Sequence, residues 1–221
     1  MHITTLIARR QLLGWLAASA AFPAAVAKTK PAAAAATAGA LGGPALMRQL
    51  NAATDAPALA EGDHGEAVVR AQVLLDRLWF SAGEIDGTFG TNMRRIVAAF
   101  QAASKLDPSG RLDESTWKAL TAKAPGPVLE NYTITHKDTV GPFIRLPPDM
   151  LGRTRLNALD YTTLHEALGE KFHCSPAWLR AINPTSAFRA GDEIVVPALG
   201  GARPAAPATS LRIDKSERLL F

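Results

Sequence analysis

The sequence predicts a mainly α-helical protein with a small α+β part. Between residues 58 and 122, apolar residues recur three and four positions apart, as they do along one face of a helix. Between residues 130 and 198, two short strand-like runs enclose two more helical patterns. Hydrophobic residues make up 48% of the 221-residue chain, which is typical of a protein with a buried core. We therefore expect a three-helix bundle followed by a module in the order strand, helix, helix, strand.

The first 27 residues have the three-part pattern of a secretory signal peptide. A basic start precedes an apolar run over residues 12–22, no acidic residue is present, and Ala25-Val26-Ala27 supplies a small-x-small cleavage site. A membrane anchor is the alternative, but Pro23 ends the run short of the ~20 residues that a spanning helix needs. The sequence thus predicts export, with no membrane span after cleavage of the signal. Its paired arginines leave both the general secretory and the twin-arginine routes open.

Residues 28–57 are rich in alanine and carry few charges. They contain Pro31, Pro44 and Pro57 and show no sustained apolar face of helical period. This composition predicts a flexible linker between the signal and the first folded domain.

The first helix of the predicted bundle begins at about Glu66. Asp63 and Glu66 have the spacing of a capping box, in which each side chain bonds a backbone N–H of the first turn. One helical face then carries Ala67, Ala71, Leu74, Leu75 and Leu78. We expect the helix to end near Trp79 and Phe80, before a glycine-containing turn.

Two more helices complete the predicted bundle, which spans residues 58–122. The second follows Gly90-Thr91, and its apolar face carries Met93, Ile96, Val97 and Phe100. The third is capped by Asp113 and turns Trp117 and Leu120 inward.

A short linker with Pro125, Gly126 and Pro127 leads into the α+β part, residues 130–198. Its strand candidates are Tyr132-Thr133-Ile134-Thr135 and Ile194-Val195-Val196.

The two helices between these strands have clear start signals. Thr163 and Glu166 have capping-box spacing for the first, and Leu164, Ala167, Leu168 and Phe172 share one of its faces. The second opens with Ser175 as N-cap and Pro176 at its first position, and Asn183-Pro184 stops it.

The charge balance argues against nucleic-acid binding. The formal net charge of +4 falls to +2 once Arg9 and Arg10 leave with the signal peptide, and the remaining basic residues are scattered. A backbone-phosphate contact needs a basic stripe. The chain has one cysteine, which excludes an internal disulfide and a multi-cysteine zinc site.

The adjacent pair His173-Cys174, with His165 nearby, is the candidate for nucleophilic chemistry. Neighbouring side chains usually project apart, whereas a working thiol and base must converge, and a lone cysteine between two helices is ordinarily an apolar filler. The histidines show no metal-ligand spacing. We therefore predict no catalytic residue, no metal and no cofactor.

An ordered set of motifs spans all three helices of the predicted bundle. It comprises Gly62-Asp63-x-Gly65-x-x-Val68-x-x-x-Gln72-x-x-Leu75, Asp86-Gly87-x-Phe89-Gly90, Phe100-Gln101, Gly110 and Thr116-Trp117-x-x-Leu120. This set closely resembles the peptidoglycan-binding domain appended to many bacterial wall enzymes. One departure is Met93, where that family commonly places Thr. The resemblance implies that peptidoglycan is the partner.

Residues 130–198 resemble a LysM module. The resemblance rests on Glu166-Ala167-Leu168, Ser175-Pro176, Leu179-Arg180, Asn183-Pro184, Gly191-Asp192 and Ile194-Val195-Val196-Pro197. The departure is an insertion from His136 to Asp160, where an ordinary LysM module has a short loop that helps to build its sugar groove. Sugar binding by this module and a spacer role both stay open.

The C-terminal segment begins a new pattern after a linker over residues 199–209. Residues 210–221 alternate as a hairpin, and Ile213-Asp214-Lys215-Ser216-Glu217-Arg218-Leu219 resembles the first hairpin of the L,D-transpeptidase catalytic domain. That family's Ser-His-Gly-Cys-x-Arg motif is absent. The sequence thus looks like the N-terminal part of an L,D-transpeptidase that lacks its catalytic domain.

Aromatic side chains near the Asp86-Gly87 turn are the candidate binding residues, because sugar rings stack on aromatic faces. The candidates are Trp79, Phe80, Asp86, Phe89 and Asn92. The alternative is a place in the core, which is favoured for Phe89 and evenly balanced for Trp79 and Phe80.

Together these features predict an exported, monomeric and non-catalytic protein that binds peptidoglycan in the periplasm or cell wall. One alternative is a shortened sequence of a murein L,D-transpeptidase, an enzyme that acts in peptidoglycan cross-linking. The other is a protein-docking module at the wall, suggested by the long insertion.

Overall fold

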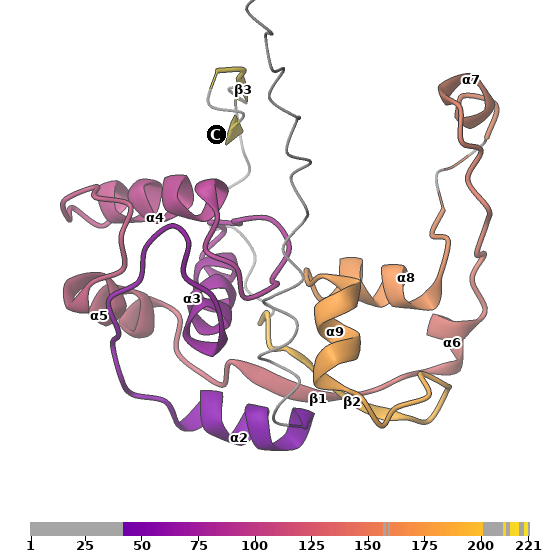
Figure 1. The fold of residues 1–221 in the computed structure, drawn as a ribbon, viewed down its shortest axis with the longest axis horizontal. Helices are drawn as coiled ribbons and strands as arrows, with labels where there is room; N and C mark the ends of the chain where they lie inside the picture. Colours follow the sequence, from indigo (N-terminus) through magenta and orange to yellow (C-terminus); the bar gives the residue numbers. More distant parts are fainter. Residues whose placement is uncertain are drawn as a thin grey trace, which may run out of the picture. The chain divides into compact units, whose positions relative to one another are not determined.

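Helices dominate the structure, and one small antiparallel sheet joins distant parts of the chain (Figure 1). The computed structural model describes residues 42–156, 158, 160–200, 210, 213–216 and 219–220. The described helices are α2 (Gly43–Ala52), α3 (Glu66–Arg77), α4 (Thr91–Ala103), α5 (Glu114–Lys123), α6 (His136–Thr139), α7 (Met150–Arg153), α8 (Leu164–Lys171) and α9 (Pro176–Ile182). The strands are β1 (Leu129–Thr133), β2 (Glu193–Pro197), β3 (Ile213–Asp214) and β4 (Leu219–Leu220). A mainly helical chain with a small β part is thereby confirmed.

The predicted signal peptide, the first part of the predicted linker (residues 28–41) and residues 201–209 lie outside the described residues. Among the helices that are described, none has the length and apolar character to cross a membrane.

Helices α3, α4 and α5 pack around one hydrophobic core, which we call the helical core. Its largest side chains are Phe89, Phe100 and Trp117, and all three are almost fully buried. The predicted faces supply the rest, including Leu75, Met93, Val97 and Leu120. Burying a large apolar side chain contributes roughly 1.5–3 kcal/mol, so this core accounts for the packing of the three helices.

The start of α3 differs from the predicted capping box. The helix begins at Glu66 as predicted, but its N-cap is Gly65, with φ of 112°, and no side chain caps it. Asp63 instead accepts a hydrogen bond from the N–H of Ala60, and Glu66 accepts one from Gln49. The box is wrong because the left-handed Gly65 turns the chain so that its own N–H donates to Gly87 O.

The other two helices follow their local signals. Helix α4 begins directly after Gly90. The Asp113 carboxylate accepts from the N–H of Thr116 and caps α5 as predicted. Hydrogen bonds from Thr116 and Ser115 hold the pKa of Asp113 below its usual value.

Part of the predicted flexible linker is a packed helix. Within the linker predicted for residues 28–57, α2 buries Leu46 and Leu50 against the sheet. Its Asn51 side chain accepts from the N–H groups of Val128 and Leu129 and donates to Leu129 O. Gly43 lies against Ile182 O so closely that a Cβ would come within 2.7 Å of it. The linker prediction is therefore wrong for residues 43–52. Their short apolar stripe is weak as a local helix signal, and the helix is stabilised by packing against the sheet.

Strands β1 and β2 pair antiparallel, with Asn131 opposite Val195. The first strand starts earlier than predicted, at Leu129, while β2 includes the predicted Ile194–Val196 run. Together with the helices between them these strands form the α+β module (residues 128–198).

The two long helices of this module begin where predicted. Ser175 caps α9, with Pro176 in its first turn. Thr163 caps α8 by accepting from the N–H of Glu166. The Glu166 carboxylate, however, accepts from the N–H and hydroxyl of Thr162, one residue before the expected partner, so only half of the capping box is present.

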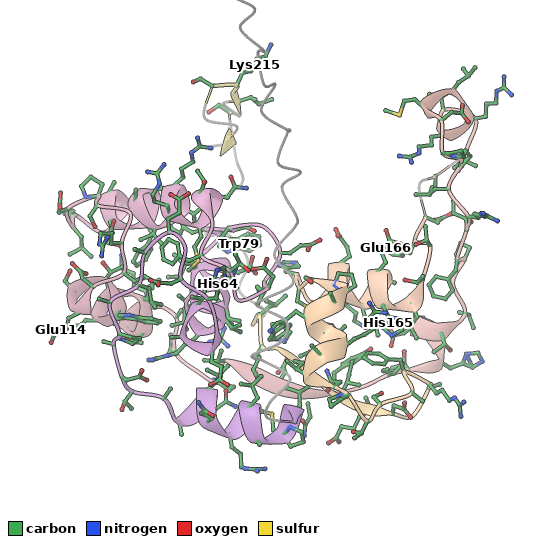
Figure 2. All side chains as sticks on the ribbon, viewed as in Figure 1. His64, Trp79, Glu114, His165, Glu166 and Lys215 are labelled. Atoms are coloured by element: carbon green, nitrogen blue, oxygen red, sulfur yellow. The ribbon has the colours of Figure 1, made fainter. Side chains whose placement is uncertain are left out.

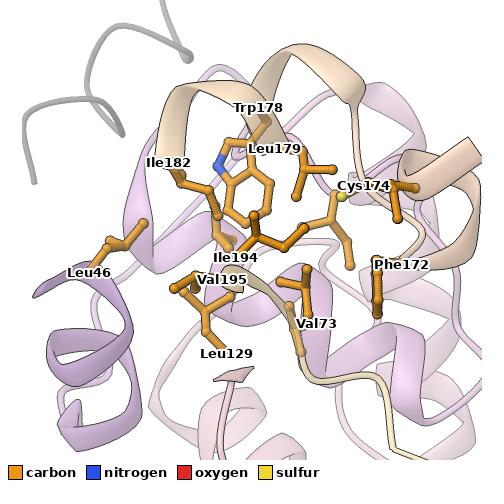
Figure 3. Packing of buried hydrophobic residues seen from close by; sticks show 14 of the residues in the cluster. Leu46, Val73, Leu129, Phe172, Cys174, Trp178, Leu179, Ile182, Ile194 and Val195 are labelled. Atoms are coloured by element: carbon orange, nitrogen blue, oxygen red, sulfur yellow. The ribbon is translucent and has the colours of Figure 1, made fainter. Parts of the chain in front are cut away.

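A second core, the shared core, joins the α+β module to α2 and α3. It contains Trp178, Leu179, Ile194 and Val195 from the module and Val73 from α3 (Figure 3). The backbone of Ile85, in the connection between α3 and α4, also bonds the α+β module. Its N–H donates to His173 O, and its carbonyl accepts from the N–H of Ser175. The Arg77 guanidinium adds hydrogen bonds to Ala198 O and Pro127 O. The regions predicted as two modules thus share buried side chains.

Asp138 ties the start of the insertion to the α+β module. Its carboxylate accepts from Lys171 Nζ (2.8 Å), the Tyr132 hydroxyl (2.5 Å) and the Thr135 hydroxyl (2.6 Å). Burial alone would raise the pKa of this carboxyl group, but the three donors outweigh burial and hold the pKa well below its ordinary 3.8.

We expect thermal stability to fall in acid partly through Asp138. Because its folded pKa lies below the unfolded one, its ionised form stabilises the fold at pH values above 3.8, and this contribution is lost as the pH falls toward the folded value. Melting temperatures measured from neutral pH downward should fall less steeply in Asp138→Asn than in the wild type. Equal slopes in the two proteins would contradict this role.

The short strands β3 and β4 pair antiparallel, as expected for the predicted hairpin. Ile213 lies opposite Leu220, and Asp214 lies opposite Leu219.

Candidate functional site

The α3–α4 connection is shaped by one buried glutamine. Gln72, on the inner face of α3, accepts from the N–H groups of Asp86 (3.2 Å) and Gly87 (2.8 Å) and donates to the Asp86 carboxylate (3.0 Å). The same carboxylate accepts from the N–H of Thr88, and Gly87 takes a left-handed φ of 74°. The Asp86–Thr88 turn is thus held by the side chains of Gln72 and Asp86.

A hollow of about 390 Å³ opens beside this turn, and we call it the turn hollow. The residues around it come from α3, the α3–α4 connection and the start of α4: Gln72, Ala82, Gly83, Glu84, Asp86, Thr88, Gly90, Thr91, Asn92 and Met93. No side chain caps α4 at Gly90, and its first turn has no acidic residue. The positive end of the helix dipole therefore borders the hollow next to the carboxylates of Glu84 and Asp86.

Glu61 adds a third carboxylate near the start of α4. It accepts from the Thr91 hydroxyl and from Arg94 Nε. The hydrogen bond from Thr91 is the main reason why the pKa of Glu61 lies below its usual value. The hollow thus combines the uncapped N-terminus of α4 with the carboxylates of Glu84 and Asp86, which suits a ligand rich in amides and hydroxyls.

The structure separates the five candidate residues. Asp86 and Asn92 line the turn hollow. Trp79 is 63% exposed and takes a left-handed φ of 67°, which is rare for a bulky residue (Figure 2). Phe80 is half-buried and meets Phe100 edge-to-face at 5.5 Å, and Phe89 is completely buried. Phe89 therefore has the core role that was favoured for it, and among the five candidates only Trp79 offers an open aromatic face.

The sequence analysis missed Glu84, Thr91 and the positioning role of Gln72. The sequence does contain a signal for the role of Gln72, because this polar residue stands among the apolar, inward-facing positions of α3. Gln101 repeats this arrangement on α4. It accepts from the N–H of Gly110 and donates to Arg111 O and to the Thr116 hydroxyl.

His173 and Cys174 have separate surroundings in the fold. The His173 ring bonds the Asp76 carboxylate through Nδ1 at 2.8 Å, and Cys174 is 2% exposed within the shared core. His165 packs against the Phe188 ring, and burial followed by repulsion from Arg180 lowers its pKa. In the described ranges, no three His, Cys, Asp or Glu side chains gather in a way that could hold a metal ion.

We expect Cys174 to be chemically inert in the folded chain. Burial, with the Glu84 charge as a second cause, raises the pKa of its thiol to about 12, so almost no thiolate exists near neutral pH. Mass spectrometry after iodoacetamide treatment should show little alkylation in buffer and complete alkylation in guanidinium chloride. Cys174→Ala should lower the free energy of unfolding by about 1 kcal/mol or less. Rapid alkylation of the native chain would contradict the burial of this thiol.

Comparison with known proteins identifies part of the chain. Residues 64–120 match the family model of the peptidoglycan-binding domain. The carboxy-terminal processing protease CtpB of Bacillus subtilis (strain 168) is 42% identical over 57 residues, which are 26% of this chain and 12% of the protease. The chain thus spans only a small part of that relative. The turn hollow and Trp79 both lie within the segment that matches the family model.

Proposed function

We propose that this chain, which carries a peptidoglycan-binding domain at residues 64–120, is an exported, non-catalytic protein that holds the bacterial cell wall through the turn hollow and Trp79. The family match over residues 64–120 carries the proposal. Export is supported by the signal-peptide pattern of residues 1–27.

The chemistry of the turn hollow suits the polymer. Peptidoglycan combines sugar rings, which have apolar faces, with N-acetyl and peptide amides. The start of α4 can donate to amide carbonyls, while Glu84 and Asp86 can accept from amide N–H and hydroxyl groups. Trp79 supplies the open ring on which a sugar face could stack. Its left-handed backbone supports a functional role, since strained positions cluster at binding sites.

The finer architecture is part of the same proposal. The helical core around α3, α4 and α5 supports a three-helix bundle. The order β1, α8, α9, β2 supports a LysM-like module that carries the 136–160 insertion. The buried Cys174 supports the absence of thiol catalysis. The likeness of residues 213–219 to L,D-transpeptidases rests on sequence alone and stays a prediction, and the similarity to CtpB covers too little of that protease to transfer its activity.

Sedimentation with purified sacculi tests the proposal. The wild-type chain should pellet with the sacculi, and Trp79→Ala should bind roughly fivefold more weakly, because an aromatic contact contributes about 1 kcal/mol. Met150→Ala is the matched control, since Met150 is 74% exposed and lies in the insertion. Phe80→Ala is unsuitable, because it would also remove the contact with Phe100.

Two outcomes would contradict the proposal. A wild-type chain that stays in the supernatant at low and moderate salt would exclude wall binding. A folded Trp79→Ala chain that pellets like the wild type would place the contact elsewhere.

A further inference from the structure

The two most exposed of the described large hydrophobic side chains are neighbours on the 136–160 insertion. Met150 is 74% exposed and Leu151 is 65% exposed, and both belong to α7. Figure 1 shows α7 at the turn between two extended chains, and we call residues 145–156 the tip. Single exposed apolar residues are ordinary, but an adjacent pair at the turn of such a segment marks a contact surface.

Local hydrogen bonds, and no hydrophobic core, hold the shape of the tip. Helix α7 contains no buried residue. The Asp149 carboxylate caps the helix by accepting from the N–H of Gly152 (2.7 Å), and Arg153 Nε donates to Pro147 O (2.8 Å). Gly152 lies so close to Pro147 that a Cβ would come within 2.7 Å of its ring. The tip is therefore a defined structure that keeps its two apolar side chains in contact with solvent.

The charge around this apolar pair is positive. Arg145, Arg153 and Arg155 are exposed, and none of the three forms an ion pair within the described ranges. The tip has one acidic residue, Asp149, whose carboxylate is occupied as the cap of α7. Three positive charges thus stand against one negative charge beside an exposed aliphatic surface.

We propose that the tip docks on the surface of an anionic phospholipid bilayer. Met150 and Leu151 are aliphatic, so they can mix with acyl chains at the headgroup boundary, whereas they offer no aromatic face for a sugar ring. Arginine side chains bury their stems at this boundary and keep their guanidinium groups at the lipid phosphates. The inference goes beyond the proposed function and does not depend on wall binding. An exported chain meets such a surface at the outer face of the cytoplasmic membrane.

Vesicle flotation tests the site with the chain from Lys28 onward. This chain keeps every residue that the structure describes and lacks the predicted signal peptide, which would itself bind lipid. The wild type should float with vesicles made of equal parts of phosphatidylglycerol and phosphatidylcholine. Binding should weaken as the salt concentration rises, because salt screens the charges. Vesicles of phosphatidylcholine alone should leave the protein in solution.

A double variant isolates the apolar part of the contact. Met150→Ser/Leu151→Ser should weaken binding to the anionic vesicles by at least about tenfold, because both inserted side chains are lost. The matched control is Val140→Ser/Ile213→Ser, which removes two apolar side chains that are 60% and 64% exposed outside the tip. This control should bind like the wild type.

A second double variant isolates the charged part. Arg145→Gln/Arg155→Gln should weaken binding to the anionic vesicles by about tenfold, since each basic side chain near an anionic surface adds to the attraction. This variant leaves the hydrogen bond from Arg153 to Pro147 in place, so α7 should keep its shape.

A fluorescent dye attached to the tip reports insertion directly. Cys174 is buried, so in Leu151→Cys the introduced thiol is the accessible one. Nitrobenzoxadiazole at this position should emit more strongly with anionic vesicles, because the polarity around the dye falls as the side chain enters the acyl boundary. The same dye on Val140→Cys should show no change.

The contrary outcomes each overturn the inference. Equal flotation of Met150→Ser/Leu151→Ser and the wild type would place the lipid contact elsewhere, and equal binding to both kinds of vesicle would exclude charge complementarity. A dye that responds to poly-glutamate but not to vesicles would identify an acidic polymer as the ligand. Sacculus binding should be the same in Met150→Ser/Leu151→Ser and the wild type, and its loss in the variant would mean that the tip holds the wall instead.

Discussion

Trp178→Ala is expected to lower the free energy of unfolding by about 3–5 kcal/mol, the largest loss from any single substitution considered for this protein. The Trp178 indole is 1% exposed and lies in the shared core with Leu179, Ile182 and Ile194 (Figure 3). Its removal leaves a large cavity, which the surrounding helices and strands of the shared core cannot close because each is also packed against other elements. The indole Nε1 has no hydrogen-bond partner in the described part of the chain, so the loss comes from packing and not from a broken polar contact.

Urea unfolding followed by circular dichroism measures this loss. Trp79→Ala is the matched control, because it removes the same side chain from a position that is 63% exposed and should change stability by about 0.5 kcal/mol or less. Since Val69, Val73 and Ile85 belong to the same core as Trp178, the helices α3–α5 and the α+β module should unfold in one transition. A loss below about 1 kcal/mol in Trp178→Ala, or two separate transitions in the wild type, would contradict the shared core.

Gln72→Leu should reduce both stability and wall binding. Leucine nearly matches glutamine in volume but leaves the N–H groups of Asp86 and Gly87 without the acceptor that they have in the wild type. An unsatisfied buried group costs about 1–3 kcal/mol, and the Asp86 N–H is only part-buried, so we expect a total loss of about 2–4 kcal/mol. The freed turn would also displace Asp86 from the turn hollow, so binding to sacculi should weaken even where the protein is fully folded.

Gln101→Leu is the control for this experiment. It removes the corresponding hydrogen bonds to Gly110, Arg111 and Thr116 and should cost a similar amount of stability. The turn that it holds does not line the turn hollow, so sacculus binding should be unchanged at a temperature where both variants are folded. Equal binding by the two variants would exclude the Asp86 turn from the contact surface.

Local signals predicted the elements whose partners lie close in sequence. The Asp113 cap of α5, the start of α4 after Gly90 and the Ser175-Pro176 start of α9 all appear as expected. Each depends on hydrogen bonds or φ preferences within one helical turn, which the sequence encodes directly. The ordered motifs over residues 62–120 likewise identified the peptidoglycan-binding domain, which the family match over residues 64–120 confirms.

The predictions were wrong where a segment far away along the chain bonds or packs against the residues in question. The predicted capping box at Asp63 is absent because Gly65 donates to Gly87 O, and this pairing depends on a turn more than twenty positions away. Helix α2 was predicted as linker because its short apolar stripe is weak until Leu46 and Leu50 meet the sheet. Local propensity cannot report a stabilising surface that other parts of the chain build.

The sequence by itself determined the class of the fold, most helix starts and the peptidoglycan-binding domain, because spacing and capping act over a few residues. Only the tertiary structure decided which aromatic residues near the Asp86 turn are open to a ligand: Trp79 is exposed, Phe80 packs on Phe100, and Phe89 is enclosed. It also decided that Phe143 and Tyr161 meet at one pocket. The exposure of a side chain, and whether two side chains meet at one pocket, depend on which segments pack around them. Those segments lie far away along the chain.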